Sequence, residues 1–168
     1  MATSSGWDSY IWKIQNKWSN KQQKYLVTNV CQHAAIYGID GSPWVTSSDW
    51  PGLHSYVHPL EQDDGSTVNV DVNEFVNCMK VTDGNRMPNA AGVRMGNTKF
   101  VFVRHDPEEK VVSLTKVNGG ACVVKTKNAI VIGMWDKNIV MSNNQPQTMG
   151  LCNEAVELVA KSLKELGY

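Results

Sequence analysis

The sequence predicts an α+β protein in which helices pack on an antiparallel β-sheet. Apolar residues recur at helical spacing near both ends of the chain. Short runs rich in β-branched residues follow one another over residues 92–135 with turn residues between them, as in an antiparallel meander. A further strand pair is expected over residues 25–47. Strands joined by short turns, with helices before and after them, are typical of α+β folds.

The first helix is expected over residues 5–18. Its apolar residues recur at intervals that align them on one helix face. They are Trp7, Tyr10, Ile11, Ile14 and Trp18. We expect Ile11, Ile14 and Trp18 to be buried against the sheet, whereas Trp12 lies off this stripe. The polar residues 19–24 are expected to form an extended turn.

The first strand pair is expected at residues 25–39 and 43–47. The first run is rich in β-branched and small apolar residues, and Asp40-Gly41 after it is a strong turn signal. The return strand carries Trp44. The two strands are therefore expected to form a hairpin.

A long surface loop is expected over residues 48–70, which contain prolines and glycines. A short helix is expected to begin at Asp71-Val-Asn-Glu74, because this segment resembles a capping box. Its buried residues are expected to be Phe75, Val76 and Met79.

The meander and a last helix complete the expected fold. The strands of the meander are expected at residues 92–95, 99–104, 110–116, 121–125 and 129–135. The last helix is expected over residues 148–166. The residues that it turns toward the sheet are expected to be Leu151, Ala155, Leu158 or Val159, Ser162 and Leu166.

Composition limits the classes of function. The chain of 168 residues has the length of one domain, residues 1–168, and its formal net charge is zero. A neutral chain has no general attraction for nucleic acid or for a membrane surface. Its four cysteines are scattered without zinc-ligand spacing, so we expect free thiols in the cytoplasm, no metal site and no cofactor.

No motif of the sequence points to an enzyme. The nucleophile-elbow serine motif, the P-loop and the HExxH zinc motif are all missing from it. A cysteine hydrolase that pairs one of the cysteines with His33 or His105 is the enzymatic alternative, because catalytic partners can be remote in the chain. We expect a binding protein that is not an enzyme.

Two groups of side chains are candidates for binding surfaces. Basic residues occur on successive strands of the meander, where they either converge on one face or only keep the sheet solvated; they are Lys99, Arg104, Lys110, Lys116, Lys125 and Lys127. Trp7, Tyr10, Trp44 and Tyr168 are expected to meet, because chain termini often lie close together. Such rings form either part of the core or an exposed trough that suits a polyproline II ligand.

Several segments, in their order and spacing, resemble the profilin family. They are Gly6-Trp-Asp-Ser-Tyr-Ile11, Cys31-Gln-His-Ala-Ala-Ile-Tyr-Gly38 with Asp40-Gly-Ser-Pro-Trp44, Gly92-Val-Arg-Met-Gly-Asn-Thr-Lys99, Gly119-Gly120 through Lys125-Thr126 to Ala129-Ile-Val-Ile-Gly133, and Gly150-Leu-Cys-Asn153 running to Tyr168. The resemblance implies a central antiparallel sheet with the N- and C-terminal helices on one face and shorter helices on the other. A PAS-like or roadblock-like sensor or scaffold domain is the alternative.

The resemblance also implies a groove for poly-L-proline and for proline-rich partners such as formins. The groove residues carried onto this chain are Trp7, Tyr10, Trp44, Leu163 and Tyr168. Ser162 stands where many members carry a histidine or a tyrosine. This difference predicts weaker or altered proline binding.

A second surface implied by the resemblance binds monomeric actin and regulates its polymerisation. Its residues carried onto this chain are Phe102, Arg104, Lys116, Lys125, Thr148, Gly150 and Asn153. Glu154 and Glu157 depart from the lysine and tyrosine that animal members tend to carry. Phosphoinositide headgroups are a secondary expected ligand, nucleic acid is not an expected partner, and the protein is expected to be a monomer at the cytoskeleton.

The chain is longer than a typical profilin at residues 15–25 and 54–70. The first insertion is expected to lengthen the first helix or to add a loop beside the proline groove. The second is expected to reach the actin-binding surface or to cover an edge of the sheet.

Overall fold

Three helices and eleven strands make up the described part of the chain, residues 6–19, 21–86 and 88–168 of a computed structural model. In chain order they are α1 (Asp8–Gln15), β1 (Lys17–Ser19), β2 (Lys24–Val27), β3 (His33–Gly38), β4 (Pro43–Thr46), β5 (Ser55–Glu61), β6 (Thr67–Asn73), α2 (Glu74–Thr82), β7 (Val93–Met95), β8 (Thr98–Asp106), β9 (Val111–Lys116), β10 (Gly119–Lys125), β11 (Ala129–Asp136) and α3 (Met149–Glu165). None of these helices is long and apolar enough to cross a lipid bilayer.

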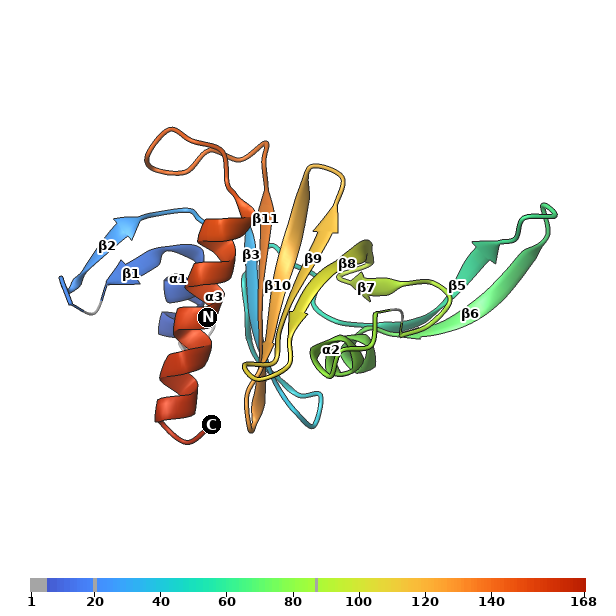
Figure 1. Ribbon diagram of the computed structural model, residues 1–168, viewed down its shortest axis with the longest axis horizontal. Helices are drawn as coiled ribbons and strands as arrows, with labels where there is room; N and C mark the ends of the chain where they lie inside the picture. The colour runs from blue at the N-terminus through green and yellow to red at the C-terminus, as the bar shows by residue number, and fades with distance from the viewer. Residues whose placement is uncertain (1–5, 20, 87) are drawn as a thin grey trace.

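The centre of the molecule is a seven-stranded antiparallel sheet with the order β4-β3-β11-β10-β9-β8-β7. Helices α1 and α3 cover one face and α2 lies on the other (Figure 1). This arrangement confirms the predicted α+β fold, with both terminal helices on the same face. Among the described residues the opposite face carries one helix, α2, where shorter helices, in the plural, were expected.

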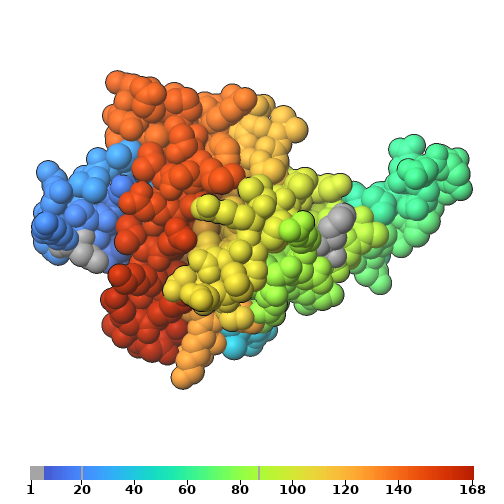
Figure 2. All heavy atoms as spheres, viewed as in Figure 1, coloured from blue at the N-terminus to red at the C-terminus, as the bar shows by residue number. Residues whose placement is uncertain are grey.

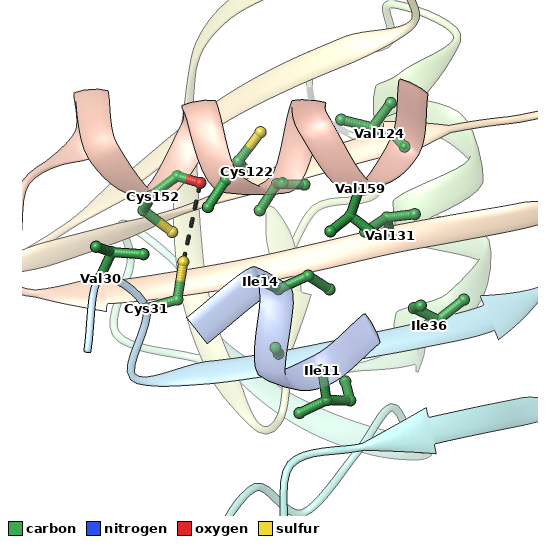
Figure 3. Packing of buried hydrophobic residues seen from close by; sticks show 14 of the residues in the cluster. Ile11, Ile14, Val30, Cys31, Ile36, Cys122, Val124, Val131, Cys152 and Val159 are labelled. Carbon is green, nitrogen blue, oxygen red and sulfur yellow. Dashed lines mark hydrogen bonds between the residues drawn. The ribbon is translucent and has the colours of Figure 1, made fainter. Parts of the chain in front are cut away.

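Alternating residues of the central strands face two separate cores. Cys122 and Val124 of β10 belong to the core under α1 and α3, whereas Val123 between them belongs to the core under α2. Val131 and Ile132 of β11 divide between the two cores in the same way. Because successive side chains of a strand point to opposite faces, these strands must be covered on both sides. Figure 3 shows the first core, in which α3 and α1 lie over the sheet.

The predicted strands are confirmed wherever turn residues separate them. Strands β7 to β11 form the expected meander, and β3 pairs with β4, which carries Trp44. The single strand predicted over residues 25–39 is wrong, because the chain forms two strands there, β2 and β3. Asn29 between them has a φ of +62°, a left-handed conformation that interrupts an extended strand.

The predicted end of the first helix at Trp18 is also wrong, because α1 ends at Gln15 and β1 follows it. Asn16 is 5% exposed; its side-chain Nδ2 donates to the Trp12 carbonyl at 2.9 Å and its Oδ1 accepts from the Asn29 N–H at 2.9 Å. This side chain ends the helix and attaches it to the distant Asn29. Trp18 is therefore half-buried on β1 and not in the helix stripe. The predicted start at residue 5 lies outside the described residues.

Residues 48–70 contain a β-strand pair where a loop was predicted. Strands β5 and β6 pair from Ser55 with Asn73 to Glu61 with Thr67, and the hairpin stands clear of the body (Figure 2). A two-stranded hairpin leaves one side of each strand unpaired, which allows Pro59 within β5. We call β5 and β6 the arm. It extends beyond the β7 edge of the sheet, so the second insertion does not lie along α3 (Figure 1).

Helix α2 buries a different face from the one predicted. Val76 is 38% exposed, and Phe75 and Met79 are only half-buried. The buried residues are Glu74, Asn77, Cys78, Val81 and Thr82. The helix is rotated in this way because the Glu74 carboxylate turns inward, where it accepts hydrogen bonds from the arm and from the β7–β8 turn.

Helix α3 confirms the predicted last helix but buries a neighbouring stripe. Ala155 and Val159 are buried as expected, whereas Leu158 is 43% exposed and Leu166 is 63% exposed. Leu151 and Ser162 are half-buried. The buried stripe also includes Cys152, Val156, Ala160 and Leu163. Val156 can approach the sheet because Gly133 beneath it has no side chain: a Cβ there would lie 2.4 Å from Val156 Cγ2.

Candidate functional site

Four aromatic rings gather where the two ends of the described chain meet β4. Trp7 precedes α1, Tyr10 lies on α1, Trp44 lies on β4 and Tyr168 is the last residue. The centroid of the Trp7 ring is 4.6 Å from Trp44, 5.3 Å from Tyr10 and 5.4 Å from Tyr168. Trp44 and Tyr168 are 5.9 Å apart. Trp7 is the central ring, and we call these four residues the aromatic cluster.

The aromatic cluster lies at the surface, above the core residues of the same helices. Ile11 and Ile14 of α1 are 8% and 0% exposed, as predicted, whereas Tyr168 is 38% exposed and the other three rings are half-buried. Leu163, a predicted groove residue, is 0% exposed and belongs to the core against which those three rings pack. Leu163 therefore supports the cluster from below and presents no surface of its own.

Tyr168 reaches the cluster through a glycine turn at the end of α3. The φ of Gly167 is +91°, a backbone conformation that residues other than glycine rarely adopt. The Gly167 N–H donates to the Lys164 carbonyl at 3.1 Å, and the Tyr168 N–H donates to the Leu163 carbonyl at 2.9 Å. These two bonds form a Schellman motif, which directs the last side chain back toward Trp7.

The residues expected to bind actin divide between the two faces of the sheet, and a β-bulge is one cause. The register of β8 against β9 shifts between Phe102 and Arg104. Phe102 packs against the core under α2, whereas Arg104 lines a hollow beside Glu157 of α3. The regular alternation of a strand would have placed Phe102 and Arg104 on the same face.

The start of α3 lies on the same side of the sheet as Arg104, the side that α1 and α3 cover. Thr148 accepts the Leu151 N–H at 3.3 Å and so caps the helix, and Gly150 is exposed. Asn153 is 4% exposed, and its Nδ2 donates to Ser113 Oγ of β9 at 2.8 Å. Asn153 therefore attaches α3 to the sheet. We call the exposed Arg104, Thr148 and Gly150 the α3 face.

Lys116 and Lys125 lie on the side of α2. The Nζ of Lys116 is 6.0 Å from the ring centroid of Phe100, which belongs to the core under α2. The Nζ atoms of Lys125 and Lys110 lie 3.4 Å and 3.3 Å from the carboxylate of Asp83, just after α2. Burial opposes the charge on Asp83, but the two lysines outweigh it and lower the pKa of that carboxyl. Lys110, Lys125 and Lys127 line one hollow together with Lys164. Lys99, Arg104 and Lys116 do not line it, so the six predicted basic side chains do not all converge on one face.

Comparisons with known proteins decide the family. The sequence model of the Profilin family matches residues 16–168. A profilin of Tetrahymena pyriformis is 32% identical over 169 residues, covering 98% of this chain and 99% of that protein. The chain belongs to the profilin family. Profilins are a non-enzymatic family of actin-regulating proteins, so this membership replaces the PAS-like or roadblock-like alternative.

Solved profilin structures share the fold of this chain. Profilin II of Acanthamoeba castellanii is 26% identical with a TM-score of 0.54, covering 83% of this chain and 89% of that one. Profilin IA of the same organism is 18% identical with a TM-score of 0.60, covering 97% and 100%. Mouse profilin IIa, in complex with a double repeat from the FH1 domain of mDia1, is 15% identical with a TM-score of 0.60, covering 98% and 100%.

The four cysteines of this profilin are poor candidates for a nucleophile. All of them are free and 0% exposed. Burial raises the pKa of the thiols of Cys78, Cys122 and Cys152. Because the thiolate is the reactive form of cysteine, these side chains do not support the cysteine hydrolase alternative.

The first insertion of this profilin forms the wall of a cavity that the sequence did not predict. A cavity of about 340 Å³ lies between the β1–β2 hairpin and α3. Its lining includes Tyr10, Lys13, Trp18, Lys21, Leu26 and Ser162. We call it the hairpin cavity. The small side chain of Ser162, at a position where many profilins carry a larger one, was the only sequence signal for open space here.

Proposed function

We propose that this profilin is an adaptor that binds monomeric actin at one surface and proline-rich segments at another. The observation that carries the proposal is the aromatic cluster, with Trp7 in contact with three other rings at the surface. Family membership and a structural relative bound to a formin-type FH1 repeat support the choice of ligand. The protein acts as a single domain and a monomer in the cytoplasm.

The aromatic cluster suits a polyproline II helix. Its rings offer flat apolar surfaces on which proline rings stack, and the indole N–H and phenol O–H groups can donate to the free carbonyls of the ligand. The polyproline II conformation is largely formed before binding, so little conformational entropy is lost. A proline-rich segment, such as that of a formin, is the ligand that fits this chemistry best.

The two proposed surfaces lie at opposite ends of α3. Thr148 and Gly150 are at its start, whereas Tyr168 follows its end. The helix has 17 residues, which at the usual rise per residue gives a length of about 25 Å. Actin and a proline-rich protein can therefore be held at the same time, which is what an adaptor that supplies actin to a filament-elongating partner requires.

Phosphoinositide headgroups are a secondary ligand in this proposal. Lys110 and Lys125 stand together at the ends of neighbouring strands, and Asp83 between them neutralises part of their charge. A multiply charged headgroup can compete with that single carboxylate for both lysines. Both lysines line a hollow that also includes Lys164 and Tyr168 at the end of α3 and that Arg104 does not line. Such a ligand would therefore lie beside the C-terminal end of α3.

Replacing Trp7 with alanine is expected to weaken the binding of poly-L-proline about tenfold or more, because it removes the central ring of the cluster. Calorimetric titration measures the dissociation constant, and unlike tryptophan fluorescence its signal does not depend on how many tryptophans a variant contains. Trp12→Ala is the matched control, since Trp12 is 56% exposed and contacts Tyr25 edge to face, outside the cluster. Equal affinities of the two variants would contradict the groove assignment.

Reversing the charge of Arg104 with Arg104→Glu is expected to weaken actin-monomer sequestration several-fold in a polymerisation assay, because Arg104 is the exposed cation of the α3 face. Poly-L-proline binding should not change. Lys80→Glu on α2 makes the same charge change at an exposed site on the other side of the molecule. If Lys80→Glu weakens sequestration as much as Arg104→Glu, the α3 face is not the actin-binding surface.

A further inference from the structure

The hairpin cavity is a positively charged site with apolar walls. Lys13, Lys17 and Lys21 line it, and the only carboxylate of its lining in the described part of the chain is that of Glu154. Glu154 Oε1 is 2.9 Å from Lys17 Nζ, so these two charges offset one another. The charges of Lys13 and Lys21 are left without a carboxylate partner among the described residues.

The cavity continues directly from the aromatic cluster. Tyr10 belongs to both, and Lys13 Nζ lies 5.8 Å from the centroid of the Tyr10 ring, one helical turn farther along α1. Ser162 lines the cavity and precedes the buried Leu163 in the chain. Because Ser162 is small, a chain that lies across Tyr10 can continue toward Lys13 without meeting a large side chain.

Resting on the proline-binding function proposed above, we propose that the hairpin cavity binds an acidic segment joined to the proline run of the same ligand. The carboxylates of the segment pair with Lys13 and Lys21. A neighbouring apolar side chain of the segment contacts the half-exposed Leu26 and Leu158. The cavity of about 340 Å³ is large enough for a few side chains but not for a folded domain.

The charge of the cavity decides between possible segments. A basic segment would be repelled by Lys13 and Lys21, and a neutral one would gain only the apolar contact. An acidic segment gains both, and its charge–charge attraction should decrease as salt shortens the screening length. This profilin is therefore expected to select proline-rich partners whose proline run is flanked by aspartate or glutamate.

The test compares decaproline with decaproline that is extended by Glu-Glu-Leu, Gln-Gln-Leu or Lys-Lys-Leu. Each extension is placed at the N-terminal end in one peptide and at the C-terminal end in another, because a polyproline helix can lie in either direction. In calorimetric titrations at low salt, the Glu-Glu-Leu peptide with the productive direction is expected to bind about five- to tenfold more tightly than its Gln-Gln-Leu counterpart. The Lys-Lys-Leu peptide should bind more weakly than both. At high salt the advantage of the acidic peptide should fall to less than about twofold.

Variants locate the effect. In Lys13→Gln/Lys21→Gln the affinity ratio of the acidic to the neutral peptide should fall close to one, whereas Lys80→Gln/Lys137→Gln, which removes the same charge at exposed positions elsewhere, should keep the wild-type ratio. Ser162→Tyr should also abolish the preference by filling part of the cavity. A ratio that survives in Lys13→Gln/Lys21→Gln, or that falls equally in the control, overturns the proposal.

Failure of this inference can be told apart from failure of the proline-binding function. If decaproline binds but the acidic and neutral extensions bind equally in both directions, the hairpin cavity does not read acidic segments and the aromatic cluster remains the proline site. If decaproline itself does not bind, the proposed proline-binding function is wrong and the inference falls with it.

Discussion

Replacing Glu74 with alanine is expected to lower the free energy of unfolding by about 3 kcal/mol or more. The Glu74 side chain is 0% exposed, and its carboxylate accepts four hydrogen bonds. The donors are the backbone N–H groups of His54 (2.9 Å), Gly96 (3.0 Å) and Asn97 (2.8 Å) and the hydroxyl of Tyr56 (2.8 Å). Alanine would leave all four donors without this acceptor, at the point where the arm joins α2 and the β7–β8 turn.

Chemical denaturation followed by circular dichroism measures this loss, and limited proteolysis shows where it acts. Cleavage within β5 and β6 should accelerate more than cleavage elsewhere, because Glu74 holds the base of the arm. Glu61→Ala removes an exposed carboxylate from the arm itself and should change the stability by less than about 0.5 kcal/mol. A similar small change in Glu74→Ala would mean that the carboxylate does not hold the arm.

Replacing Gly133 with alanine is the second substitution with a large expected effect, a destabilisation of about 1–3 kcal/mol. The added Cβ would lie 2.4 Å from Val156 Cγ2, 3.2 Å from Cys31 Sγ and 3.3 Å from Cys152 Sγ, all of them side chains that are 0% exposed. Figure 3 shows the two cysteines in the core under α3. Valine has a stiff side chain that cannot turn aside easily. Helix α3 must therefore lift away from the sheet, and both proposed surfaces depend on its position.

A double-mutant cycle with Val156→Ala tests that cause. Val156→Ala alone should destabilise the protein by opening a cavity, but in combination with Gly133→Ala it removes the clash. The loss of unfolding free energy in the double mutant should therefore be smaller than the sum of the losses in the two single mutants. Gly150→Ala, at a helix position where an added Cβ meets nothing within 4 Å, should be neutral or stabilising. Additive losses in the cycle would show that the close approach of Val156 to Gly133 is not what limits this site.

Local signals explain why so much of the sheet could be predicted. Asn118 between β9 and β10 has a φ of +62°, and Gly41 between β3 and β4 has a φ of +91°. Asparagine and glycine adopt these conformations readily, so the sequence marks these turns without knowledge of the rest of the fold. The start of α3 was also predictable from a local signal, because its capping residue, Thr148, directly precedes the helix in the sequence.

The errors fall where distant residues decide the local structure. The end of α1 depends on Asn16 and its hydrogen bond to Asn29, and the buried face of α2 depends on the carboxylate of Glu74 and its partners on the arm. The helix stripe that continues to Trp18 and the loop-like composition of residues 48–70 were both misleading. Neither pattern contains information on a partner many residues away.

The fold class, the meander, the family resemblance and the residues of the aromatic cluster could all be predicted from the amino-acid sequence, because each depends on local order, turn residues or motif spacing. Three features became visible in the folded protein: the contacts among the four rings, the bulge that separates Phe102 from Arg104, and the basic cavity that the β1–β2 hairpin lines beside Tyr10. The physical reason is that these features arise from packing between segments far apart in the chain, where one extra residue in a strand or one docked hairpin changes which side chains share a surface.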